Sequence, residues 1–186
     1  MHRFAPVSVL LLIFLLVSAT VTRADVLEVS FDIKPTSCPN PLNPPDELFV
    51  PVLPTAILGT KDLSASSIDV GSLVIVVPGG GGFGEILIPP IGGGGIEDVA
   101  TPVEDNSDCQ CTEEGPDGFL DLTVHFDKDK IAKALGEVYP GQEIELCIRG
   151  ALLDESKFEG CDCIVIVGPV SVDSGTWGRV KASYRD

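Results

Sequence analysis

The sequence is poor in basic residues, with 12 Lys and Arg against 28 Asp and Glu among 186 residues. Binding of nucleic acid or of an anionic membrane surface needs clustered Lys and Arg, so this shortage argues against nucleic acid as a partner and against such a membrane surface. Apolar residues are not scarce, because 44% of the chain is hydrophobic and runs rich in Val, Ile and Leu recur along it. Simple disorder is therefore excluded as well.

Catalytic motifs are also missing. His125 is the only histidine after residue 24, and no G-x-S-x-G sequence accompanies it as a serine hydrolase would require. Asp173 begins a D-S-G-T sequence typical of aspartic proteases, but no second copy exists to complete a pair of aspartates. The glycine tracts 79–82 and 92–95 lack the Lys of a phosphate-binding loop. We therefore expect a protein that is not an enzyme.

A long apolar run occurs once, at the N-terminus. Val7–Val17 is almost entirely apolar, follows the basic Arg3, and precedes the small residue Ala24. This run of about a dozen apolar residues is shorter than the roughly 20 residues that a membrane-spanning helix needs. Residues 1–24 are therefore predicted to be a signal peptide. The alternative is an uncleaved anchor. We expect a secreted protein, in the extracellular space, the periplasm or at the cell surface, without a membrane span after cleavage.

The remaining 162 residues have the size of one domain with a substantial core. The first 24 residues hold two basic and no acidic residues, which leaves ten basic against 28 acidic residues and a net charge of −18. We expect a β-sandwich domain over residues 25–170, with a Gly-rich insertion at 79–95, and a polar C-terminal tail over 171–186.

Six cysteines follow the predicted signal peptide: Cys38, Cys109, Cys111, Cys147, Cys161 and Cys163. An even number of cysteines in an exported chain favours disulfides, and six allow 15 pairings. Bonds within either C-x-C pair would close strained small rings, and excluding them leaves ten pairings. Among these we expect one that joins one of Cys109 and Cys111 to one of Cys161 and Cys163. The complete pairing stays open. A thiolate metal site is less favoured, because zinc prefers C-x-x-C spacing and usually recruits histidine.

Alternating apolar and polar residues predict β-strands. Val26–Lys34 alternates with Asp32 on its polar face, and Leu120–Phe126 alternates with Asp121 directed outward. Further strands are expected over 49–58, 73–77, 85–88, 143–149 and 161–167. Pro51 and Pro54 place part of the first of these at a sheet edge.

One short helix is predicted over Lys128–Leu135, because Asp127 is a suitable N-cap and Gly136 a suitable stop. About seven short strands separated by turns, with this single helix, indicate an all-β fold. We expect an antiparallel, immunoglobulin-like β-sandwich that is stapled by disulfides.

An acidic loop offers the one candidate metal site. Glu97 and Asp98 precede it, and Asp117 and Asp121 lie at i and i+4 near its end, where Gly115 and Gly118 allow the backbone to bend. Calcium is bound by six to eight hard oxygen atoms from carboxylates and carbonyls on a bending backbone. We therefore predict calcium at these four carboxylates, the alternative being a solvated acidic loop without a ligand.

Several motifs occur together along the chain: D-I-K-P-T-S-C-P-N-P-L-N at 32–43, V-L-P-T-A-I-L-G-T at 52–60 and E-G-P-D-G-F-L-D-L at 114–122. In this combination the chain resembles an uncharacterised family of β-rich modules found in secreted and surface proteins of prokaryotes, over residues 26–167. The resemblance implies an extracytoplasmic β-rich module and no known catalysis. It implies neither a disulfide pairing nor calcium.

These observations predict a secreted, non-enzymatic structural or binding module, stabilised by calcium, whose partner is an extracellular protein or a glycan. One alternative is a small secreted hydrolase that uses two carboxylates of the acidic loop on opposite sides of a cleft. The other alternative is an adhesion module that presents the Gly-rich segment 79–95 to its partner.

Overall fold

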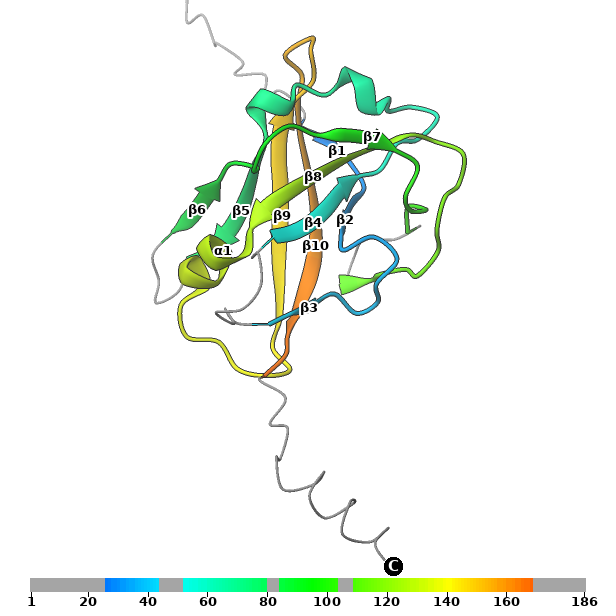
Figure 1. The fold of residues 1–186 in the computed structure, drawn as a ribbon. Helices are drawn as coiled ribbons and strands as arrows, with labels where there is room; N and C mark the ends of the chain where they lie inside the picture. Colours follow the sequence, from blue (N-terminus) through cyan, green and yellow to red (C-terminus); the bar gives the residue numbers. More distant parts are fainter. Residues whose placement is uncertain (1–25, 44–51, 80–83, 104–108, 169–186) are drawn as a thin grey trace, which may run out of the picture.

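Two β-sheets face each other and enclose the hydrophobic core, with one α-helix at their side (Figure 1). This computed structural model describes residues 26–43, 52–79, 84–103 and 109–168. The predicted signal peptide, the C-terminal tail and the D-S-G-T sequence lie outside the described residues. The predicted all-β, disulfide-stapled architecture is confirmed, whereas the strand order does not establish an immunoglobulin-like topology.

Sheet A has the strand order β1-β10-β9-β5-β6, and β3 also pairs with β10. Its strands are β1 (Leu27–Glu28), β3 (Pro41–Leu42), β5 (Val74–Pro78), β6 (Glu85–Ile88), β9 (Glu143–Ala151) and β10 (Lys157–Ile166). The pairs β1–β10 and β10–β3 are parallel, so the expectation of a purely antiparallel fold is wrong for these two short strands.

Sheet B has the order β2-β4-β8-β7 and is antiparallel throughout. Its strands are β2 (Phe31–Ile33), β4 (Val52–Ile57), β7 (Gly95–Glu97) and β8 (Asp121–Asp127). Two short 3₁₀ helices, Ala65–Ser67 and Val70–Ser72, lie between β4 and β5. The side chains of Phe126, Ile57 and Ile33 from sheet B and of Phe158, Ile148 and Ile75 from sheet A are buried in the core.

The predicted first strand is divided between the two sheets. Val29 N–H donates to the Glu159 carbonyl in sheet A at 3.0 Å, whereas the Ser30 carbonyl accepts from Leu58 N–H beside sheet B at 2.9 Å. The chain therefore crosses from one sheet to the other at Val29 and Ser30. Alternation alone does not reveal this crossing, because the apolar residues on both sides of it, Val29 and Phe31, are buried in the same core.

Pro54 lies in an inner strand, so the expectation of a sheet edge there is wrong. The strand β4 is flanked by β2 and β8, and the Pro54 carbonyl accepts from Lys34 N–H at 2.9 Å. In a strand, the N–H and C=O of one residue face the same neighbour. The missing N–H of Pro54 therefore faces the β2 side, where β2 has already ended at Ile33, and no ladder hydrogen bond is lost.

The helix α1 spans Lys128–Leu135, as predicted. The Asp127 side chain accepts from Lys130 N–H at 3.0 Å, which satisfies a free N–H of the first turn. Gly136 has a positive φ of 70° and ends the helix. Ile131 and Leu135 are buried and attach α1 to the core.

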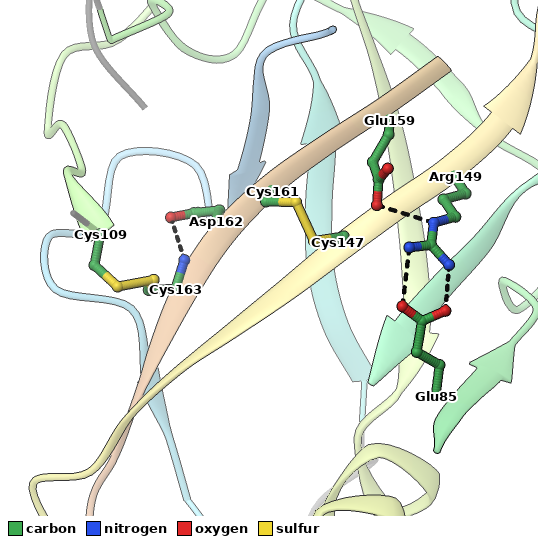
Figure 2. Close-up of a disulfide and its surroundings, with 8 residues drawn as sticks. All are labelled: Glu85, Cys109, Cys147, Arg149, Glu159, Cys161, Asp162 and Cys163. Atoms are coloured by element: carbon green, nitrogen blue, oxygen red, sulfur yellow. Dashed lines mark hydrogen bonds and ion pairs between the residues drawn. A yellow bond between two sulfur atoms is a disulfide. The ribbon is translucent and has the colours of Figure 1, made fainter. Parts of the chain in front are cut away.

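Three disulfides join Cys38 to Cys111, Cys109 to Cys163 and Cys147 to Cys161. The Cys109–Cys163 bond is the expected link between the two C-x-C pairs. Cys147 and Cys161 are cross-strand partners on β9 and β10 (Figure 2). Because all six cysteines are bonded, no thiolate is available for a metal. Within the described residues, no helix is long and apolar enough to cross a membrane.

Candidate functional site

An open groove of about 430 Å³ on the outer face of sheet B brings together residues that are far apart in the sequence. It is lined by Glu97 of β7, by Asp98 after β7 and by His125 of β8. His125 is exposed there because the neighbouring β8 side chains Val124 and Phe126 point into the core. The groove walls add hydroxyl groups and proline rings from Pro35, Thr36, Pro54, Thr55, Pro116 and Thr123.

Asp98 holds one wall of the groove in place. Its Oδ1 accepts from Asp117 N–H at 3.0 Å and its Oδ2 accepts from Gly118 N–H at 2.9 Å. Asp117 in turn accepts from Phe119 N–H at 2.9 Å. Both oxygens of Asp98 thus hold the turn that places Pro116 in the groove. The other carboxylate of the groove, Glu97, accepts no hydrogen bond from any described residue.

Asp121 lies on the outer face of β8, as predicted, but it is fully buried because the segment after β7 covers that face. Its Oδ1 accepts from Gly59 N–H at 2.8 Å, and its Oδ2 accepts from Val99 N–H at 2.8 Å and Ala100 N–H at 3.3 Å. Burial raises the pKa of Asp121, and these three hydrogen bonds oppose the rise. Its carboxylate connects β8 to the segment after β4 and to the segment after β7, which is a structural role.

The four carboxylates of the predicted calcium site lie in one region but are not gathered around one point. Asp98 accepts hydrogen bonds from the backbone of the Asp117 turn. Glu97 lies opposite the buried Asp121 on the adjacent strands β7 and β8. Within the described ranges, the one group of three metal-ligating side chains with ligand atoms within 4.8 Å is Glu145 with the disulfide-bonded Cys147 and Cys161. Calcium at the acidic loop stays a prediction.

A second group of carboxylates, Asp32 and Asp162, is buried between the edges of the two sheets. Asp162 Oδ2 accepts from Ile33 N–H at 2.7 Å and from Asn40 Nδ2 at 2.9 Å, and its Oδ1 accepts from Cys163 N–H at 2.6 Å (Figure 2). Burial and the neighbouring charge of Asp162 raise the pKa of Asp32 to about 7. Burial raises the pKa of Asp162 to about 6, against the opposing effect of its hydrogen bonds.

Sequence reasoning missed this pair because alternation placed Asp32 on the polar face of its strand. In the structure Asp32 is 7% exposed, since the segments around Thr101 and Thr112 cover that face. The disulfides of Cys109 and Cys111 hold the second of these segments there. The sequence signal was the position of both aspartates inside short motifs, D-I-K-P for Asp32 and C-D-C for Asp162.

A third hollow, also of about 430 Å³, lies between β6 and α1 and is mainly apolar. Ile86 and Leu87 of β6 line it and are 37% and 56% exposed, and Lys130 and Lys133 of α1 lie opposite. β6 forms the end strand of sheet A and pairs with β5. An adhesion module that presents segment 79–95 would use this surface, because β6 belongs to that segment.

Comparison with family models, with curated proteins and with solved structures finds no match for this chain.

Proposed function

We propose that this protein is a secreted, non-enzymatic binding module that holds a cationic segment of an extracellular partner protein in the groove of Glu97, Asp98 and His125. The observation that carries the proposal is the groove itself, an open hollow of about 430 Å³ with two carboxylates and no Lys or Arg among its described lining residues. A site of one charge sign attracts ligands of the opposite sign and orients them on approach.

The lining also offers groups suited to a peptide. The exposed Thr36 hydroxyl can pair with a backbone amide, and the proline rings at 35, 54 and 116 provide apolar contact. Three disulfides favour an oxidising compartment, which supports secretion.

The arrangement of Asp98 favours binding over hydrolysis. A carboxylate-dependent hydrolase needs two carboxylates free to act on opposite sides of a bond. Here Asp98 uses both oxygens to hold the turn at Asp117 and Gly118, which leaves Glu97 as the carboxylate free of such bonds in this groove. We therefore assign Glu97 to ligand contact and Asp98 to shaping the wall.

The first prediction concerns Glu97. A capped Lys-Ala-Arg-Ala-Lys peptide should bind in the groove at low salt, and Glu97→Gln should weaken it about 3–10-fold, the effect of losing one partly exposed charge pair of about 1 kcal/mol. Calorimetry gives the affinity, and amide chemical shifts locate the contact near His125.

Glu143→Gln is the matched control, because Glu143 is also exposed but lies at the start of β9, away from the groove. It should leave the affinity unchanged. A peptide with Gln in place of Lys and Arg should bind more weakly than the cationic peptide. Equal affinity of the two peptides, or binding of cellohexaose instead of either peptide, would refute the assignment of a cationic peptide to this groove.

A further inference from the structure

Asp162 joins the two sheets at a position where its negative charge is enclosed. Its side chain is 8% exposed and accepts hydrogen bonds from Ile33 in β2, from Asn40 and from the backbone of Cys163. These three donors are neutral. Neutral donors stabilise a carboxylate but do not remove its charge, so the site keeps a net negative charge whenever Asp162 is ionised.

Asp32 adds a second acid to the same place, and no described residue donates a hydrogen bond to its buried Oδ2. Within the part of the chain that the structure describes, this Oδ2 has no hydrogen-bond partner, and neither has the buried Oδ1 of Asn40. A buried polar atom without a partner costs about 1–3 kcal/mol, and more if it is charged. Two neighbouring carboxylates, one of them unpartnered, therefore call for a positively charged or proton-donating occupant.

A cavity of about 10 Å³, the size of one water molecule or one ion, is lined by both Asp32 and Asp162. Ser30, Gln110 and Thr112 add hydroxyl and amide oxygens to its lining. None of the described residues that line it is basic. The cavity thus offers hard oxygen ligands, negative charge and space for a single small ion.

We propose that Asp32 and Asp162 bind one calcium ion in this cavity, with oxygen atoms of Ser30 and Gln110 completing its coordination. Calcium accepts irregular sets of carboxylate, hydroxyl and amide oxygens, whereas magnesium demands near-octahedral geometry. The ion neutralises both carboxylates and ties β2 and β10 to the segment fixed by Cys109 and Cys111. This site does not include the groove or the four carboxylates Glu97, Asp98, Asp117 and Asp121, although Gln110 comes from the same loop. It does not depend on the proposed function.

The second prediction tests this site on the purified chain with its three disulfides intact, freed of metal with EDTA. Calcium at about 100 times its Kd should raise the Tm by roughly 5–10 °C at pH 7.5, since ligand binding to the folded state stabilises it by mass action. Asp32→Asn should abolish this shift, because the amide removes the charge that the ion neutralises. In EDTA the variant should melt at the same temperature as the parent or higher, because the repulsion with Asp162 is gone.

Asp117→Asn is the matched control, since Asp117 is an exposed member of the acidic loop. It should keep the full calcium response. A response lost in Asp117→Asn and kept in Asp32→Asn would overturn the proposal in favour of the loop. Absence of any shift in the parent protein at millimolar calcium, or an equal shift with magnesium, would also overturn it.

A crystal grown with calcium gives a readout that does not depend on the variants folding. An anomalous peak about 2.3–2.6 Å from carboxylate oxygens of both Asp32 and Asp162 is expected. A water molecule at that position in the presence of saturating calcium, or a peak confined to Glu97 and Asp117, contradicts the proposal.

Discussion

At the scale of single residues, the buried carboxylates are the least conventional feature of this protein. Asp121 offsets its burial with three backbone hydrogen bonds, whereas Asp32 Oδ2 has none. The difference shows in the pKa of Asp32, which burial and Asp162 raise to about 7. Asp121 thus belongs to the framework, and Asp32 is the residue whose charge state changes near neutral pH.

The third prediction is a loss of stability with rising pH in metal-free protein. Because the folded-state pKa values of Asp32 and Asp162 are raised from 3.8 to about 7 and about 6, the folded state binds protons more tightly than the unfolded state. Protonation of Asp32 and Asp162 therefore stabilises the folded state. This contribution to the free energy of unfolding is complete below about pH 4 and is lost as the pH rises to 7. Between pH 5 and 7.5 in EDTA, the free energy of unfolding should fall by on the order of 3–4 kcal/mol.

Urea denaturation at both pH values measures this change, and Asp32→Asn should flatten it. Carboxylates with lowered pKa values, such as Asp127 and Asp154, act below pH 4 and do not affect the comparison. Stability that stays level or rises between pH 5 and 7.5 would show that Asp32 ionises normally.

At the scale of elements, α1 is the part whose local sequence explains its structure most completely. Asp127 begins it, Gly136 ends it, and Ile131 and Leu135 face the core. The strands depend more on their surroundings. β1 and β2 come from one alternating run but enter different sheets, and Pro54 is accommodated in an inner strand because its neighbour β2 is short.

The fourth prediction concerns the cap of α1. Asp127→Ala should lower the free energy of unfolding by about 1 kcal/mol, because the Lys130 N–H loses its acceptor at the helix start. Chemical denaturation measures the loss. Asp129→Ala is the control, since Asp129 places a similar charge in the first turn without acting as the N-cap. Equal losses in the two variants would assign the effect to the charge near the helix end rather than to the cap.

At the scale of the whole molecule, two disulfides do more than close loops. Cys38–Cys111 and Cys109–Cys163 hold one segment across the outer side of β2 and β10, and this segment covers Asp32. Cys147–Cys161 joins two strands that already pair through nine residues each. Two of the bonds therefore fix the position of a covering segment, whereas the third reinforces a strand pair that hydrogen bonds already hold.

The fifth prediction is an order among the disulfides. The sequence separation is 73 residues for Cys38–Cys111 and 14 for Cys147–Cys161. Loop-closure entropy then gives a loss of about 4 kcal/mol for the Cys38→Ser/Cys111→Ser variant and about 3 kcal/mol for Cys147→Ser/Cys161→Ser. Denaturant unfolding of the two double variants measures these losses. A larger loss for the Cys147–Cys161 pair would show that local strand pairing depends on that bond.

The sequence by itself determined the all-β class and the positions of α1, β5, β6, β8 and β9. The strand and helix positions follow from short-range periodicity and from capping residues, whereas the link between the two C-x-C pairs was an expectation chosen among ten open pairings. The sequence also grouped Glu97 and Asp98 with Asp117 and Asp121 as one candidate calcium site and gave His125 no role in it. Short-range patterns could not place Glu97, Asp98 and His125 in one groove, because that depends on how β4, β7 and β8 lie side by side.

Tertiary structure alone decided which carboxylates are buried. Alternation placed Asp32 and Asp121 on polar faces, since a strand pattern shows two faces but not what covers the outer one. Here the outer faces are covered by residues 99–103 and by residues 109–112, which two disulfides anchor. That covering encloses Asp32 with Asp162 and turns two ordinary acidic residues into the proposed calcium site.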